Sequence, residues 1–139
     1  MPVVRRFDHL AVVVEDIEQA LGFWRDALGL TVERIVEVPE QQSEIAFLPL
    51  AGAEIELVRP TDAESGVARY LQKRGPGMHH ICLEVDDLPA MLERLRRHKV
   101  RLIHDEPLTA DDGKRLAFIH PEAAHGVLVE LYQLPSESA

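Results

Sequence analysis

Two stretches of the chain share one pattern, in which alternating apolar and polar residues give way to a helical spacing. Residues 7–17 align with residues 78–88, and Asp16 matches Asp87 at the same offset. Strict alternation predicts a half-buried strand, and apolar residues three and four apart predict an amphipathic helix. Each aspartate is placed to cap its helix by accepting hydrogen bonds from unpaired backbone N–H groups. The chain therefore contains two copies of a strand–helix unit.

The two predicted helices each place their apolar side chains on one face. The first begins after Asp16 and ends at Gly29, because glycine readily takes the backbone conformation that follows a helix. The second begins after Asp87. The predicted buried stripes are Ile17, Ala20, Leu21, Trp24 and Leu28 in the first helix, and Leu88, Met91, Leu92 and Leu95 in the second.

Three strand-like runs follow each helix, which completes two copies of a βαβββ module. A short helix at residues 67–73 and the hinge Gly75-Pro76-Gly77 separate the copies. We expect an α+β protein in which two tandem βαβββ modules form an open, curved mixed sheet. The chain is expected to be one domain, 1–139, with module one at about 5–60, the linking helix and hinge at 61–77, and module two at about 78–133. The predicted strands after the helices are residues 31–38, 44–50 and 54–59, and residues 101–104, 115–120 and 126–131.

Two histidines and two glutamates occupy matching places on these strands. Side chains alternate between the two faces of a strand, and the helix of each module must cover the apolar face. His9 and His80, on the first strand of each module, therefore point away from the helices. Glu56 and Glu130, on the last strand of each module, also lie opposite the apolar face. The sequence thus predicts one inward histidine and one inward glutamate per module.

This set has two interpretations. A strand histidine is often an ordinary core residue, and an inward glutamate often pairs with an arginine. A carboxylate among apolar residues is costly to bury without a cation or a hydrogen-bond partner. Because the His–Glu pair occurs in both modules, we expect His9, Glu56, His80 and Glu130 to hold one divalent cation. Such a nitrogen and oxygen set suits Zn²⁺, Co²⁺, Ni²⁺, Mn²⁺ or Fe²⁺. His79 faces the helix side and is the weaker ligand candidate of the adjacent pair, and structural roles are assigned to His98, His104, His120 and His125.

The composition excludes some classes of partner. The formal net charge is −9, which argues against a nucleic-acid partner. No apolar run is long enough to cross a membrane, and the first residues lack the apolar region of a secretory signal. Cys82 is the single cysteine and is interpreted as a buried structural thiol. We therefore expect a cytoplasmic protein without a membrane segment.

Short motifs along almost the whole chain resemble the vicinal oxygen chelate superfamily, which includes glyoxalase I and extradiol dioxygenases. Within that superfamily the chain is most similar to the methylmalonyl-CoA epimerase family. The likeness includes Asp8-His9-Leu10-Ala11-Val12 and Glu54-Ile55-Glu56-Leu57. The most family-specific motifs are Met78-His79-His80-Ile81, Ile119-His120-Pro121 and Gly126-Val127-Leu128-Val129-Glu130-Leu131.

The resemblance implies a metal-dependent epimerase that interconverts (R)- and (S)-methylmalonyl-CoA. The family reaction removes the C2 proton and returns one to the other face, through an enolate that the metal stabilises. By likeness to the family, Glu130 and Glu44 are the candidate acid/base residues. The resemblance also implies a small-molecule acyl-CoA substrate, one divalent metal ion per chain (Co²⁺, Mn²⁺, Zn²⁺ or Ni²⁺) and a homodimer.

Two positions depart from the family pattern. Thr109-Ala110-Asp111-Asp112-Gly113 stands where family members usually have Gly-Ala-His-Gly, and Glu122 stands where a lysine often follows His-Pro. If these positions contact the acyl group or the CoA phosphates, we expect this protein to differ from the family in its affinity for the substrate or in the substrate itself. The cations considered as partners for the phosphates are Lys73, Arg74, Lys114 and Arg115.

Two alternatives remain at this stage. A glyoxalase I-type lactoylglutathione lyase can use a similar His/Glu/His/Glu site, but its usual Asp-Pro-Asp-Gly turn is absent between His120 and Gly126. A non-catalytic small-molecule-binding member of the superfamily is the other, although such proteins tend to lack the ligand residues that are present here. Proton exchange at C2 and metal content distinguish these classes.

Overall fold

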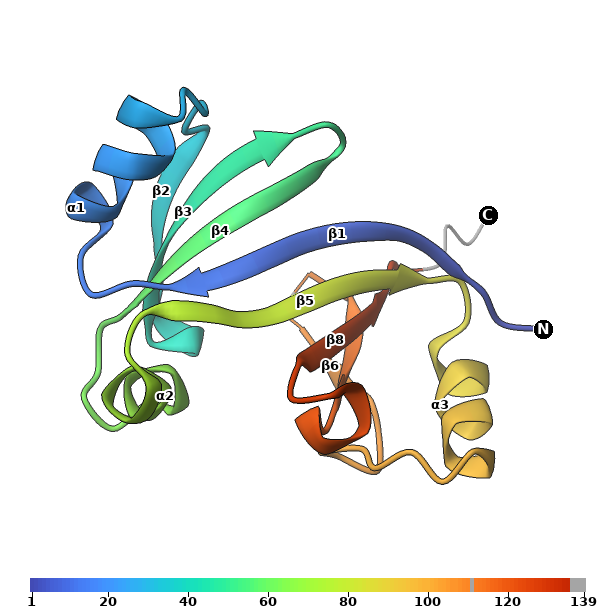
Figure 1. Ribbon diagram of the computed structural model, residues 1–139. Helices are drawn as coiled ribbons and strands as arrows, with labels where there is room; N and C mark the ends of the chain where they lie inside the picture. Colours follow the sequence, from blue (N-terminus) through green and yellow to red (C-terminus); the bar gives the residue numbers. More distant parts are fainter. Residues whose placement is uncertain (111, 136–139) are drawn as a thin grey trace. The chain divides into compact units, whose positions relative to one another are not determined.

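A computed structural model describes residues 1–110 and 112–135 of the chain (Figure 1). The chain divides into two compact units. The N-terminal unit comprises residues 9–79, and the C-terminal unit comprises residues 1–8 together with the described residues from 80 onward. The long strands β1 (Val4–Val13) and β5 (Gly77–Val85) contribute residues to both units. The linking helix of the sequence prediction belongs to the N-terminal unit.

The N-terminal unit contains four strands in the order β2-β3-β4-β1 (Figure 1). Strand β4 pairs in parallel with β1 and antiparallel with β3, which in turn pairs antiparallel with β2. The succession of elements along the chain is that of the predicted module, and the combination of parallel and antiparallel pairs makes the sheet mixed, as expected. Besides β1, the elements are α1 (Ile17–Leu21), the π-helical turn η1 (Gly22–Ala27), β2 (Arg34–Val38), the 3₁₀ turn η2 (Pro39–Gln41), β3 (Ser43–Leu50), β4 (Ala53–Pro60) and α2 (Gly66–Arg74).

The first helix begins as expected and ends differently. The side chain of Asp16 accepts a hydrogen bond from the backbone N–H of Gln19 at 2.8 Å, as a helix N-cap does. The segment then widens into η1, where the N–H of Leu28 donates to the carbonyl of Phe23 at 2.9 Å. This wider turn breaks the 3.6-residue period, and Leu28 is 55% exposed although the period predicted it to be buried. Gly29, with φ of 88°, ends the segment.

The sheet of the N-terminal unit has two apolar faces. On the helix face, Ile17 and Leu21 of α1 pack in one cluster with Ala46, Leu48 and Leu57 of the sheet. The opposite face, which carries His9 and is called the histidine face below, has its own buried cluster. That cluster contains Ala11, Ile45 and Val58, with Val38, Phe47 and Val67 packed against it. The predicted alternation along β1 is confirmed.

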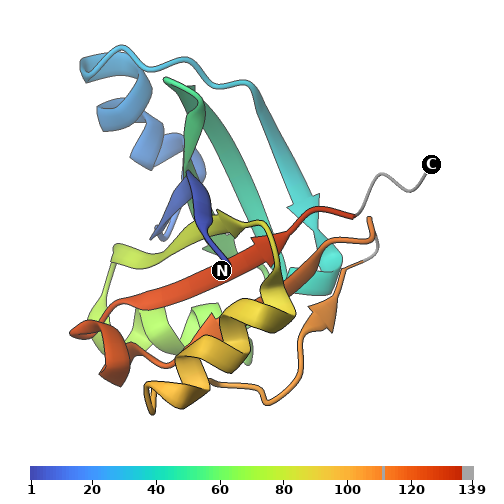
Figure 2. The ribbon, with the colours of Figure 1, turned by 90° about the vertical axis from the view of Figure 1, so that its right-hand side faces the viewer.

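The C-terminal unit repeats the arrangement with four strands in the order β5-β8-β7-β6. Its sheet pairs β5 with β8 in parallel, and β8 with β7 and β7 with β6 antiparallel. Leu88 and Leu92 of α3 pack on the helix face against Ala117 and Leu131, and Figure 2 shows α3 (yellow-orange) lying along these strands. Besides β5, the elements are α3 (Leu88–Arg97), β6 (Leu108–Thr109), β7 (Arg115–Ile119), the 3₁₀ turn η3 (Pro121–Ala124) and β8 (Leu128–Gln133).

The second module differs from prediction in one strand. Residues 101–104, all of them described, form no strand; Leu102 makes only an isolated bridge with Ile119. The short strand β6 also pairs with β7, and it begins four residues after the predicted strand ends. The α+β class and the two βαβββ modules are otherwise as predicted. Among the helices of the described residues, none is both long and apolar enough to span a membrane.

Candidate active site

The first predicted pair, His9 and Glu56, lies on the histidine face of the N-terminal unit. Strand pairing places Ala11 opposite Glu56, so the His9 side chain reaches Glu56 along the diagonal between β1 and β4. His9 Nδ1 is 3.2 Å from Glu56 Oε2, and the two side chains are only 11% and 12% exposed. A nearly buried carboxylate beside an imidazole is a suitable half of a metal site.

The second pair, His80 and Glu130, repeats this geometry in the C-terminal unit. Strand pairing places Cys82 opposite Glu130, which is the same diagonal. His80 Nε2 is 3.3 Å from Glu130 Oε1, and the side chains are 15% and 16% exposed. Both predicted pairs are therefore formed, one within each unit.

The chemistry of these donors fits a divalent metal. Each unit supplies one imidazole nitrogen and one carboxylate, and both groups can coordinate a divalent cation as they stand. In each pair the distance between the imidazole nitrogen and the carboxylate oxygen is short enough for the two atoms to share a proton or a cation. Two such pairs would give the mixed nitrogen and oxygen set of a catalytic metal site, which keeps positions open for substrate. The convergence of all four residues on one ion stays a prediction.

Glu44, the second predicted acid/base residue, lies on the other side of its sheet. On β3 it alternates with Ile45, so it shares the helix face with Ala46 and Leu48. Its Oε1 accepts a hydrogen bond from Arg59 Nε at 3.0 Å. The same two residues line a hollow of about 280 Å³ beside the start of α1, with Asp16, Ile17, Glu18 and Ile35.

The position of Glu44 corrects one expectation. Within the N-terminal unit, the histidine face of β3 presents the buried Ile45 rather than a carboxylate. Glu44 faces α1, while His9 and Glu56 occupy the opposite face. Sequence alternation alone could have shown this, because Glu44 falls in phase with Ala46 and Leu48. The placement speaks against a role for Glu44 beside the metal ligands.

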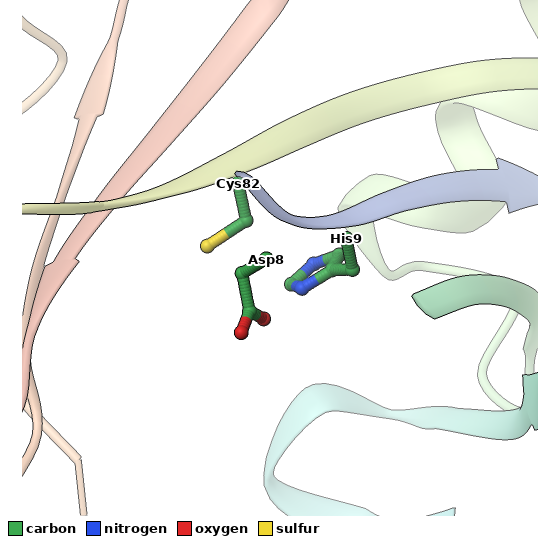
Figure 3. Close-up of side chains that lie close together, drawn as sticks. All are labelled: Asp8, His9 and Cys82. Carbon is green, nitrogen blue, oxygen red and sulfur yellow. The ribbon is translucent and has the colours of Figure 1, made fainter. Parts of the chain in front are cut away.

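A polar network that the sequence did not suggest lies on the face of the C-terminal sheet that carries His80, which is called the histidine face of that unit. The Tyr132 hydroxyl is 2.9 Å from Asp8 Oδ1 and 2.9 Å from Glu84 Oε1. Arg6 Nε donates to Glu84 Oε1 at 3.0 Å, and Arg6 Nη2 donates to the Tyr132 hydroxyl at 3.1 Å. Burial, and then its hydrogen bonds to the two carboxylates, raise the pKa of Tyr132, so the phenol stays protonated as a donor. Figure 3 shows the side chain of Asp8, a member of this network on β1, close to Cys82 on β5.

The other predicted positions are mostly at the surface. Glu122 is exposed and pairs with Arg101 at 3.0 Å. Asp111, inside the departure at residues 109–113, lies outside the described residues. Lys114 is 3.7 Å from Asp112, and its ammonium lies 5.2 Å from the centre of the Tyr132 ring. Cys82 is buried, as expected. His98 and His104 are exposed, as structural side chains at the ends of elements can be.

The sequence matches the Glyoxalase/Bleomycin resistance protein/Dioxygenase superfamily over residues 8–118, and the chain belongs to that superfamily. Mitochondrial methylmalonyl-CoA epimerase of Mus musculus is 40% identical over 129 residues, covering 92% of this chain and 72% of that protein. Ethylmalonyl-CoA/methylmalonyl-CoA epimerase of Cereibacter sphaeroides is 35% identical over 134 residues, covering 95% of this chain and 100% of that protein.

A solved structure shows the same likeness. A variant of Streptomyces coelicolor methylmalonyl-CoA epimerase, in complex with 2-nitronate-propionyl-CoA, has a TM-score of 0.83 and 30% identity, with 99% of each chain covered. These matches confirm the fold, the resemblance to the methylmalonyl-CoA epimerase family and the expectation of an epimerase-like enzyme.

Proposed function

We propose that this chain is a metal-dependent epimerase that interconverts (R)- and (S)-methylmalonyl-CoA by removing and returning the C2 proton. The observation that carries the proposal is the repeated His–Glu contact, His9 with Glu56 and His80 with Glu130, at 3.2 Å and 3.3 Å. The likeness to methylmalonyl-CoA epimerases supports the substrate. A pair repeated in both modules is what a site assembled from a duplicated scaffold requires.

Four side chains are proposed to hold the ion, namely His9, Glu56, His80 and Glu130. A bound divalent cation would supply positive charge where negative charge develops on the substrate oxygens. The chain's own contribution is orientation, because rigid strands fix each imidazole and carboxylate. Low exposure of all four side chains excludes much of the water that would screen their charges.

Glu130 is the proposed base that removes the C2 proton. It is the carboxylate of the family-specific motif, and its neighbours in β8 are apolar. A carboxylate has two oxygens, so one can face a cation while the other accepts a proton. Inversion also needs a proton donor on the other side of C2. Glu44 would have to leave Arg59 and the helix face of β3 to serve there.

Replacing Glu44 by glutamine is therefore expected to change the exchange rate little. The substitution removes an ion pair with Arg59 that is partly exposed, and such pairs are worth at most about 1 kcal/mol, so the expected change is below about fivefold. Rates of C2-deuterium exchange in the variant and in wild-type protein provide the test. A loss of about a hundredfold or more would instead restore Glu44 to the acid/base role.

The finer details of the proposal come from the resemblance. The ion is proposed to be Co²⁺, Mn²⁺, Zn²⁺ or Ni²⁺, one per chain, since histidine and glutamate ligands accept each of them. We further propose a cytoplasmic homodimer with an acyl-CoA substrate and no nucleic-acid partner. The net charge of −9 supports the last point.

One pair of assays separates this function from its alternatives. Purified protein loaded with each divalent metal is incubated with methylmalonyl-CoA in D₂O, and separately with a glutathione hemithioacetal. The proposal predicts deuterium at C2 and no isomerisation of the hemithioacetal. The reverse result would identify a glyoxalase I-type enzyme, and inactivity with every metal and both substrates would favour a binding protein.

A further inference from the structure

We infer that the network of Arg6, Asp8, Glu84 and Tyr132 positions the His80–Glu130 pair by fixing the register of β8 against β5. These four are positioning residues, since none of them belongs to the proposed ligand set. The inference rests on the proposed function, because it assigns the network to the same site. Its support is the placement of the network on the two strands that carry His80 and Glu130.

The network and the ligand pair occupy one strip of the sheet. On β5, His80, Cys82 and Glu84 share the histidine face, and on β8 so do Glu130 and Tyr132. Glu84 is the direct pairing partner of Tyr132, and Cys82 is that of Glu130. Tyr132 therefore lies two residues from Glu130 along the strand, about 7 Å away at the usual rise. Whatever fixes Tyr132 against Glu84 also fixes Glu130 against His80.

The charges of this strip select one register. A one-residue slip would turn the apolar residues of β8 to the wrong face. A two-residue slip keeps the faces. In one direction it would place Glu130 opposite Glu84, where two carboxylates repel each other, and in the other direction it would move Tyr132 from Glu84 to Cys82. In the observed register Glu84, which is 6% exposed, receives hydrogen bonds from Arg6 and Tyr132. Losing those partners would leave a buried carboxylate unsatisfied, which is costly.

The network also fixes the chain that leads into the first ligand. Asp8 directly precedes His9, and its carboxylate bonds with the Tyr132 hydroxyl and with Arg6. Strand β1 is thus held at residue 8 by two side chains of the same unit. A residue that supports ligands in this way typically changes metal affinity when it is altered, by about ten- to a hundredfold for a direct partner of a ligand.

The test replaces Tyr132 by phenylalanine, which keeps the ring and deletes the hydroxyl. Ser43→Ala is the control for loss of a buried hydroxyl, because Ser43 Oγ donates to the backbone carbonyl of Gln41 at 2.9 Å in the other unit. Calorimetric titration with Co²⁺ measures metal affinity, and amide hydrogen exchange of residues 128–132 in metal-free protein measures the fixing of β8. Urea unfolding reports stability separately.

For Tyr132→Phe we expect Co²⁺ affinity about tenfold lower and faster exchange in β8. Where active, the variant should lose kcat with KM for the acyl-CoA unchanged. Ser43→Ala should leave Co²⁺ affinity as in wild type. Glu84→Gln keeps an acceptor for Arg6 and Tyr132, so it should retain more affinity than Glu84→Ala and remains informative if Tyr132→Phe unfolds.

Two results would overturn the inference in different ways. If Tyr132→Phe lowers the urea midpoint but binds Co²⁺ as tightly as wild type, the network serves stability alone and the proposed function stands. If wild-type protein itself binds no Co²⁺, the proposed metal site fails and takes the inference with it. The wild-type titration is therefore the first measurement.

Discussion

Replacing Glu130 by glutamine is expected to lower the rate of C2-proton exchange by about 10²- to 10⁴-fold, the usual contribution of a positioned general base. Glutamine has the same shape, and its amide oxygen can still lie beside His80, but it cannot accept a proton from carbon. Exchange of deuterium from D₂O into methylmalonyl-CoA, followed by NMR or mass spectrometry, measures the effect. The assay is run at saturating metal, so that weaker metal binding does not mimic the loss of the base.

Glu122→Gln provides the matched control for this prediction. It is the same substitution in the same unit, at an exposed residue whose partner is Arg101. An exposed ion pair contributes at most about 1 kcal/mol, so the control should keep its rate within about fivefold. If Glu130→Gln exchanged the C2 proton as fast as Glu122→Gln, with metal bound in both, another group would be the base.

Removing the metal is expected to abolish exchange altogether. The C2 proton leaves only if the negative charge that forms on the substrate oxygens is stabilised. The cation that the two His–Glu pairs are proposed to hold would provide this stabilisation. Protein dialysed against EDTA should show no exchange above the solution background. Addition of Co²⁺, Mn²⁺, Zn²⁺ or Ni²⁺ to one equivalent should restore it, with rates that rank the ions.

Ligand variants make the metal prediction specific to this site. His80→Ala removes one of the four proposed ligands and should bind Co²⁺ at least about a hundredfold more weakly. His98→Ala is the control, because His98 is exposed at the end of α3 and lies outside the proposed site. Full exchange by metal-free protein, or equal Co²⁺ affinity in both variants, would contradict the proposed role of the ion.

Much of the fold follows from alternation and repetition in the sequence. The offset that aligns His9 with His80 also aligns the capping residues Asp16 and Asp87, and both caps form. Face assignment on the strands was equally direct, because a strand has a period of two and one face had to meet a helix. These rules placed the histidine and glutamate of each module on one face, and the structure adds the direct contact within each pair.

The differences arise where tertiary packing decides. The helical period predicts Leu28 in the core, but η1 interrupts that period, and no residue type in the segment specifies a π-helical turn. Residues 101–104 have the composition of a strand, yet only Leu102 bridges to β7, and the edge strand forms at Leu108 and Thr109. Such a choice between two short edge segments depends on loop geometry rather than on strand preference.

The network around Tyr132 was missed for a different reason. Its members come from β1, β5 and β8 and are far apart in the sequence. The sequence does contain one sign of the network, because strand alternation places Glu84 on the same face of β5 as His80. Its partners Arg6 and Tyr132 could not be identified without the pairing of β5 with β8.

A crystal structure of Co²⁺-loaded protein, with anomalous diffraction recorded at the cobalt edge, tests the central claim most directly. We expect one anomalous peak per chain, with His9, Glu56, His80 and Glu130 at about 2.0–2.2 Å from it, as first-row metals bind nitrogen and oxygen ligands. At least one further coordination position should face the substrate site. A peak bound by other residues, or two His–Glu pairs hydrogen-bonded to each other without a cation, would contradict the account.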